Sequence, residues 1–343
     1  MPSTQVMTFS GRFVRSLIHF AIRQGVAPEA LYALTGLDDE ALQDESLRVP
    51  AKVYNAVANA AVAQGKDPSF GFHFGQYLNL STAGLIVQIS QTSGTVREAL
   101  QHTCDFANLG CQAIPLRLEE GTSEARMYLS PHPEWEATAP EPVRHTAEGM
   151  LAFMWRAFRS LTLQQYPLHA VWVKGPANGR EVEFAEVFGI PVLFDQSEYA
   201  IFFKPEHVAA PVATRDFRLL QLLVQHAQQK LAELQANQAF VDTVRDAMLN
   251  LMAPEFPTLE QVADMLHLSV RTLQRRLGEE GTTYKALLDE LRQTFAQRYL
   301  ADKELSVSEV AYLLSYGEVS AFSRSFRRWT GQSPVQFRKT MAR

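Results

Sequence analysis

The second half of the sequence repeats one spacing pattern, and this pattern is typical of a helix-turn-helix. The first copy places apolar residues 3, 5, 10 and 14 positions after Ala263, at Leu266, Leu268, Leu273 and Leu277. The second copy places them 3, 5, 11 and 15 positions after Ala311, at Leu314, Tyr316, Phe322 and Phe326. A capping box precedes each copy: Thr258 with Gln261, and Ser306 with Glu309. The sequence therefore predicts two helix-turn-helix motifs, with one additional residue in the second turn.

The second helix of each motif has an outward polar face that suits nucleic acid. The outward residues are Arg271, Gln274 and Arg275 in the first copy, and Ser320, Ser323 and Arg324 in the second. Arginine and glutamine pair with the edges of guanine and adenine, and serine hydroxyls reach bases or phosphates. Acidic residues are expected to avoid these faces, because phosphate would repel them. Two copies at matched positions favour DNA binding over a merely solvated helix face.

The stretch between the motifs predicts a rigid spacer. The sequence TTYKALLDELRQTFAQRYLAD indicates one helix of about 19 residues, or about 28 Å. Consecutive major grooves on one face of DNA are about 34 Å apart, so such a helix can set two recognition helices into adjacent grooves. Charge agrees with this contact: the net charge is −5, yet residues 319–343 contain six Lys and Arg and no Asp or Glu. A local basic patch indicates one polyanion contact.

The sequence divides into three parts. Residues 1–212 predict an α+β domain with a predominantly antiparallel sheet, because AIPLRLEEGTSEARMYLSP alternates around Gly121 as a hairpin does. A long helix is expected over 142–165, followed by three strands at HAVWVK, PVLFD and YAIFFK. Residues 238–343 predict an all-α domain that contains both motifs and the spacer helix.

A connecting helix with a regular apolar side is predicted over residues 213–237. The spacing is 3, 4, 3, 4 and 3 between Phe217, Leu220, Val224, Ala227, Leu231 and Leu234. This is the a/d pattern of a coiled coil. Two interpretations stay open: the helix packs on its own domain, or it forms the seam of a homodimer.

The C-terminal part resembles the AraC/XylS family of bacterial transcription regulators, because SAFSRSFRRWTGQSPVQFR is close to that family's C-terminal signature. The N-terminal part resembles the ligand-binding domain of the ornithine-regulator branch, through VFGIPVLFDQSEYAIFFKPE and RVPAKVYNAV. The family pattern has glycine in the second turn, where this chain has Ser315. The resemblance implies that the outward residues named above read bases. It also makes Thr272, Arg276 and Arg327 candidate phosphate contacts.

An effector pocket is expected along helix 142–165, whose apolar residues cover more than one face. Its lining would include Met150, Phe153, Met154 and Phe158. A helix buried all round is also typical of a plain core, although Met- and Phe-rich surfaces line adaptable pockets. An amino-acid site would need a buried carboxylate, and Glu148 is expected only at the edge. An apolar or acyl-chain effector is therefore favoured, its carboxylate met by Arg144 or Arg156. The resemblance leaves an amino acid such as ornithine as the alternative.

The expected function is a ligand-responsive, sequence-specific activator that recruits RNA polymerase. No phosphate loop or metal-ligand spacing occurs in the sequence, so no catalytic residue, metal or cofactor is expected. No apolar run reaches the roughly 18 residues of a membrane span, and the start lacks the order of a signal peptide. A cytoplasmic location without membrane contact is expected. Two alternatives stay open: a DNA-binding regulator controlled by a protein partner, and an enzyme fused to a DNA-binding domain.

Overall fold

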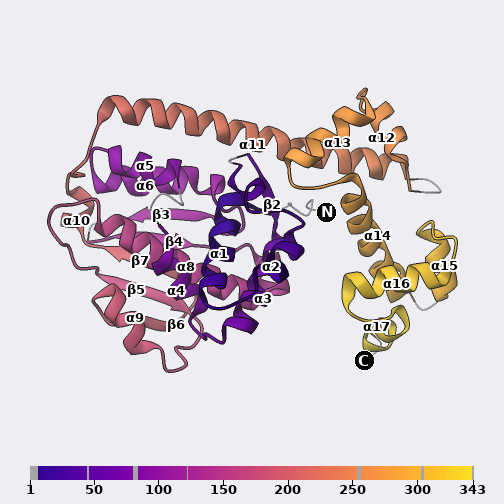
Figure 1. The fold of residues 1–343 in the computed structure, drawn as a ribbon, viewed down its shortest axis with the longest axis horizontal. Coiled ribbons are helices and arrows are strands. Elements are labelled where there is room, and N and C mark those ends of the chain that lie inside the picture. Colours follow the sequence, from indigo (N-terminus) through magenta and orange to yellow (C-terminus); the bar gives the residue numbers. More distant parts are fainter. Residues whose placement is uncertain are drawn as a thin grey trace. The chain divides into compact units, whose positions relative to one another are not determined.

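The structure is a computed structural model that describes residues 7–44, 46–79, 84–121, 123–252, 256–302 and 305–341, with the backbone alone at 237–239, 340 and 341. The chain divides into two compact units, one within Thr4–Gln235 and one within Ala236–Arg343. Figure 1 shows that the first unit holds the sheets and the second is built of helices.

The first unit is organised around a five-stranded sheet in the order β3-β4-β7-β5-β6. The strands are β3 (Leu116–Glu120), β4 (Ala125–Leu129), β5 (Ala170–Lys174), β6 (Leu193–Gln196) and β7 (Tyr199–Phe203). β3 and β4 form the predicted hairpin, and only β5 and β6 pair in parallel within this described sheet. The predicted α+β domain with a predominantly antiparallel sheet is confirmed. A second small sheet pairs β1 (Thr8–Ser10) with β2 (Arg48–Pro50).

The first unit also contains helices. They are α1 (Gly11–Arg23), α2 (Pro28–Thr35), α3 (Ala51–Gly65), α4 (Phe70–Tyr77), α5 (Leu85–Thr92), α6 (Val96–Phe106), α7 (Pro133–Thr138), α8 (Pro140–Arg159), α9 (Glu181–Phe188) and α10 (Pro205–Ala209), with short 3₁₀ turns η1 (Ala41–Gln43) and η3 (Ala107–Leu109). The predicted helix 142–165 is α8, which ends six residues earlier than expected. The chain turns there to bury Leu161, and the Leu161 carbonyl accepts a hydrogen bond from Ala213 N at 2.8 Å.

Helices α4 and α8 approach so closely that only glycine fits between them. A Cβ added at Gly71 would lie 2.0 Å from the His145 carbonyl oxygen, and one at Gly75 would lie 2.0 Å from the Gly149 carbonyl oxygen. Real Cβ atoms do not approach other atoms so closely, because interiors are packed to contact and do not yield by more than an ångström. The glycines of the sequence FGFHFGQY therefore fix how α8 lies in the core.

The connecting helix is α11 (Phe217–Leu251), and most of its predicted seam faces the chain itself, whereas Phe217 at its start is exposed. Leu220 and Ala227 are buried in a cluster with Ile89 of α5 and Phe106 of α6, and Val224 and Leu231 pack against the same cluster. Figure 1 shows the first half of α11 running along α5 and α6. The dimer-seam interpretation of this apolar side is thus wrong. The a/d spacing reflects packing on its own domain, which buries the same stripe that a coiled coil would.

The second unit combines the end of α11 with six shorter helices. They are α12 (Leu259–Met265), α13 (Val270–Glu279), α14 (Tyr284–Ala301), α15 (Val307–Leu313), α16 (Val319–Thr330) and α17 (Pro334–Met341). Phe322, Phe326 and Phe337 form the core around α16, with Val310, Ala311 and Leu314 of the α15 region and Ala296 and Leu300 of α14. The all-α domain with two helix-turn-helix motifs and a spacer helix is confirmed.

Candidate DNA-binding interface and effector domain

The first helix-turn-helix consists of α12 and α13. Thr258 and Gln261 form the predicted capping box at the start of α12. The turn passes through His267, whose φ of 54° lies in the left-handed region. Leu268 N then donates to the Ala263 carbonyl at 2.9 Å, which closes the turn over the small residue at the helix crossing.

The second helix-turn-helix, α15 and α16, repeats this geometry. Ser306 and Glu309 form its capping box, and Tyr316 N donates to the Ala311 carbonyl at 3.0 Å. Ser315 takes the left-handed conformation with φ 58°, at the same place in the turn as His267. The turn therefore keeps its conformation without the glycine of the family pattern. The Ser315 hydroxyl accepts a hydrogen bond from Phe256 N at 3.3 Å, which helps to hold the serine there.

The predicted base-reading residues lie on the outer faces of α13 and α16. Leu273 and Leu277 point into the first core, and Arg271, Gln274 and Arg275 are exposed. On α16, Phe322 and Phe326 are fully buried. Ser320 and Arg324 are exposed and Ser323 is half-buried. Both helices thus present the polar side that the sequence predicts, and contact with bases stays a prediction for these six residues.

Acidic residues do occur beside these faces, contrary to expectation. Glu279 lies one helical turn after Arg275 and forms an ion pair with it. Glu318 precedes α16 and accepts a hydrogen bond from the Ser320 hydroxyl at 3.0 Å. An (i, i+4) pair holds an exposed arginine weakly, by about 0.3–0.5 kcal/mol, so Arg275 can exchange Glu279 for a base edge.

The three predicted phosphate contacts differ in their surroundings. Thr272 exchanges a hydrogen bond with the Ser269 hydroxyl at 2.8 Å, and Arg327 is exposed. The Arg276 guanidinium lies 3.6 Å from the centroid of the Phe240 ring on α11, a cation–π contact. Arg276 therefore ties the recognition helix α13 to α11 within the second unit, a role that its place in the repeat did not reveal.

One arginine of the basic run SAFSRSFRRWTG, Arg328, forms an ion pair within the domain. Arg328 donates to Asp289 on α14 at 3.1 Å and so joins α16 to the spacer helix. Sequence reasoning missed this pair, because the two residues are 39 positions apart and no local pattern connects them. The spacer α14 itself has 18 residues. At about 1.5 Å per residue its length is about 27 Å, close to the prediction.

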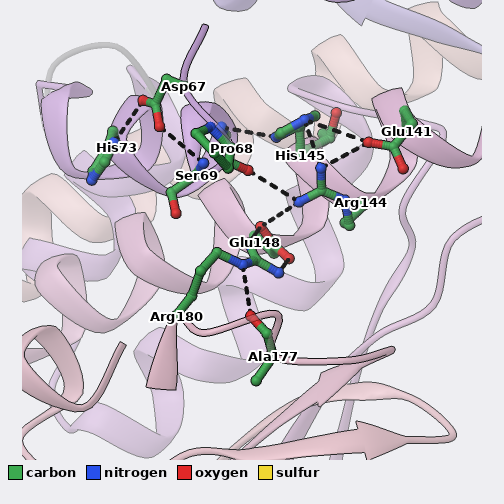
Figure 2. A network of polar contacts seen from close by, with 12 residues as sticks. Asp67, Pro68, Ser69, His73, Glu141, Arg144, His145, Glu148, Ala177 and Arg180 are labelled. Atoms are coloured by element: carbon green, nitrogen blue, oxygen red, sulfur yellow. Dashed lines mark hydrogen bonds and ion pairs between the residues drawn. The ribbon is translucent and has the colours of Figure 1, made fainter. Parts of the chain in front are cut away.

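In the first unit, Glu148 of α8 is fully buried, not at the edge as predicted. The Arg180 guanidinium donates to both of its carboxylate oxygens, at 2.7 and 3.0 Å. Arg144 contacts the same carboxylate at 3.4 Å and Glu141 at 2.7 Å (Figure 2). A buried carboxylate is retained only when it is paired in this way. Arg180 lies 32 residues away on a turn before α9, so no local pattern connects the two residues.

His145 completes this network without charge. Its Nδ1 accepts a hydrogen bond from Gly71 N at 3.1 Å, so it also joins α8 to α4. Burial, with Arg144 next to it, lowers the pKa of His145 to about 4. The imidazole is therefore neutral at physiological pH. Within the network of Figure 2, the negative charge of Glu148 is balanced by arginine rather than by histidine.

Two domain families match this chain. The arabinose-binding domain of AraC transcription regulators matches residues 25–212, and a helix-turn-helix domain matches residues 262–340. The ornithine utilization regulator of Pseudomonas aeruginosa is 30% identical over 333 residues, 95% of both chains. The chain belongs to the AraC family of transcription regulators.

Two further regulators are similar to this chain. The regulator VirS of Mycobacterium tuberculosis is 26% identical over 288 residues, 81% of both chains. The crystal structure of the regulator CdpR from Pseudomonas aeruginosa is 25% identical, with a TM-score of 0.47 over 96% of this chain and 98% of that one. The helix-turn-helix family, the ornithine utilization regulator and VirS indicate a transcription regulator and no enzymatic family, as predicted. The protein is thus a DNA-binding transcription regulator of the AraC family with an N-terminal ligand-binding domain.

The predicted pocket residues of this ligand-binding domain lie in two environments. Met154 and Phe158 are buried in the main core, and Met150 and Phe153 pack at its border. Arg144 is engaged by Glu141 and Glu148, and Arg156 donates to the Gln76 carbonyl. Each arginine proposed to receive an effector carboxylate is therefore already bonded within the chain. Among the described residues, no helix is both long and apolar enough to cross a membrane.

Proposed function

We propose that this AraC-family regulator is a ligand-responsive activator that acts in the cytoplasm and recruits RNA polymerase. The observation that carries the proposal is the matched pair of recognition helices. Arg275 and Arg324 are exposed on corresponding faces of the two recognition helices, in a chain that also contains a domain of the ligand-binding type. An effector changes activity by as much as its affinity differs between the DNA-competent state and the other states. The base-reading and phosphate roles of the residues named above belong to this proposal.

The effector that we propose is apolar, with an acyl-chain carboxylate favoured over an amino acid. The border residues Met150 and Phe153 of α8 supply apolar contact. The buried Glu148, which could have held an ammonium group, is already neutralised by Arg180. Ornithine is the alternative, because the Pseudomonas aeruginosa relative is named as an ornithine utilization regulator.

The test is a DNA mobility shift combined with calorimetry, using decanoate and ornithine as ligands. Phe153→Ala should weaken decanoate binding, because it removes a partly buried apolar side chain at the border of the core from the proposed contact with the ligand. Leu163→Ala is the matched control, since Leu163 is 91% exposed. If only ornithine produced binding heat, and this heat were the same in wild type and in Phe153→Ala, the acyl-chain assignment would be wrong. If neither ligand nor other metabolites changed DNA affinity, ligand responsiveness itself would be wrong.

We also propose that the regulator forms a homodimer through the outward side of α11. Leu219 and Leu222 are exposed on this side of the helix, by 44% and 65%. Exposed apolar residues grouped on one helix side are typical of an interface. This side lies away from α5 and α6, so it remains available when the inward side packs on the domain.

A further inference from the structure

A buried imidazole lies where the sheet leads into α11. His207 of α10 is 1% exposed, and neither of its ring nitrogens has a hydrogen-bond partner among the described residues. Most buried polar groups in proteins are hydrogen-bonded, so a buried side chain with two unsatisfied nitrogens calls for a reason. Neutral imidazole offers one donor and one acceptor to a group that reaches it.

Aromatic rings surround His207. Tyr166 stacks on the imidazole with 5.1 Å between ring centroids, Phe203 lies at 5.5 Å and Trp155 at 6.3 Å. The polar atoms of these walls are used elsewhere, since the Tyr166 hydroxyl donates to Gln164 and the Trp155 indole to the Val187 carbonyl. Phe158, one of the predicted pocket residues, stands against Phe203 at 5.7 Å. The site is thus apolar except for the imidazole.

The charges around His207 leave it without a fixed partner. Burial lowers the pKa of His207 to about 4, and the neighbouring Glu206 opposes this shift only in part. Tyr166, in the stretch between α8 and β5, is the titratable group that stacks on the ring, and Trp155 and Phe203 carry no titratable group. The arginines of α8, which are Arg144, Arg156 and Arg159, are bonded to other groups. In the free protein His207 is therefore neutral at neutral pH.

We propose that His207 binds the acid group of an acyl-chain effector and becomes protonated as the complex forms. This proposal rests on the proposed function and assigns its effector contact to His207 instead of Arg144 or Arg156. A carboxylate that enters an apolar site needs a counter-charge. The imidazole supplies it by taking one proton from solvent, so that imidazolium and carboxylate form a neutral hydrogen-bonded pair. An ammonium ligand would leave its charge unpaired there.

The position of His207 links this site to the start of α11. Directly after α10, the Ala210 carbonyl accepts a hydrogen bond from Val96 N of α6 at 3.0 Å. Ala213 N then donates to the Leu161 carbonyl at 2.8 Å, and Asp216 N to the Thr92 carbonyl at 3.0 Å. Asp216 immediately precedes α11. An ion pair formed at His207 therefore acts on the segment that anchors this helix to α5, α6 and the end of α8.

The test is calorimetry of the full chain with decanoate at pH 7, in phosphate and in Tris buffer. These buffers differ in ionisation enthalpy, so the difference in heat gives the number of protons taken up. His207 has a lowered pKa of about 4 and is neutral before binding, and the proposal has it protonated in the complex, so we expect an uptake of about one proton per decanoate. His207→Gln keeps hydrogen-bonding atoms but cannot take the proton. It should abolish the uptake and weaken binding at least about tenfold.

His226→Gln on the exposed side of α11 is the matched control and should change neither quantity. If His207→Gln fails to fold by circular dichroism, His207→Phe replaces it, because phenylalanine suits an aromatic site. Decanoate binding without proton uptake, or uptake that survives in the variant, would overturn the proposal, as would 1-decanol binding as tightly as decanoate. Absence of decanoate binding, with ornithine still changing DNA affinity, would refute the His207 site and leave the ligand-responsive function standing.

Discussion

At the scale of single residues, exposed arginines of similar sequence context have different partners. Arg324 is exposed, whereas Arg328, four positions later, is bound to Asp289 of the spacer helix. The repeat predicted which arginines face outward, because outward placement follows from helical periodicity alone. It could not predict which of them an acid on another helix would engage.

Because these arginines have different partners, substituting each one should affect DNA binding differently. Arg275→Ala or Arg324→Ala should each cost about 1–3 kcal/mol of specific DNA binding, because a base contact is lost. Arg327→Ala should weaken binding to all sequences alike and reduce its salt dependence, as expected for a phosphate contact. Mobility shifts on specific and random DNA at several salt concentrations measure both effects. Arg328→Ala is the control and should leave sequence discrimination unchanged; equal discrimination in all four variants would contradict the base-reading assignment.

The second prediction at this scale concerns the left-handed residue in each helix-turn-helix turn. His267 and Ser315 both have positive φ, which costs a non-glycine residue about 1 kcal/mol. His267→Gly should raise the free energy of unfolding by up to about 1 kcal/mol, since the exposed His267 ring supports no contact that the turn needs. Ser315→Gly should gain less, because it loses the hydrogen bond from Phe256 N. Urea denaturation checks this order, and a larger gain at Ser315 would contradict it.

At the scale of elements, the sequence predicted individual helices and strands better than it predicted which elements pack against each other. The capping boxes, the hairpin and both helix-turn-helix motifs depend on residues close together in the chain, and each was confirmed. The apolar side of α11 was also predicted, but its spacing does not distinguish burial by a partner chain from burial by α5 and α6. Glu148 and Arg180 are brought together by the tertiary fold, so no sequence periodicity predicts their ion pair.

The crossing of α4 and α8 gives a sharp test at this scale. Gly75→Ala should destabilise the N-terminal domain by at least about 3 kcal/mol, because the new Cβ would collide with the Gly149 carbonyl. Gly65→Ala is the matched control. Its Cβ would meet Phe70 at an ordinary 3.5 Å, and alanine favours the helix by about 0.5 kcal/mol. Thermal unfolding of both variants measures the difference, and similar melting temperatures would show that the helices can separate cheaply.

The outward side of α11 is tested through the oligomeric state. Leu222→Asp should convert the proposed homodimer to monomer, because an unpaired carboxylate would have to be buried in the interface. Gln225→Asp, at an exposed polar position of the same helix, should leave the dimer intact. Sedimentation velocity distinguishes the two states. Val224→Asp should instead weaken the fold of the first unit, since Val224 packs on α5 and α6.

At the scale of the whole molecule, the ligand-binding domain and the DNA-binding helices belong to different units. The N-terminal ligand-binding domain contains the aromatic site around His207 and the buried network of Glu148. The C-terminal unit presents exposed polar faces on two recognition helices. The sequence predicted this division from composition and from the repeat. The sites inside the N-terminal domain could not be predicted, because they are assembled by contacts between residues far apart in the chain.

The central claim is that one chain reads DNA with both helix-turn-helix motifs. Hydroxyl-radical footprinting on a site selected from random DNA by the wild-type chain tests it most directly. We predict two protected patches about 10 base pairs apart for each bound chain. Alanine at Arg271, Gln274 and Arg275 should erase one patch, and alanine at Ser320, Ser323 and Arg324 the other. A single patch per chain, or two patches that persist in either triple variant, would contradict the account.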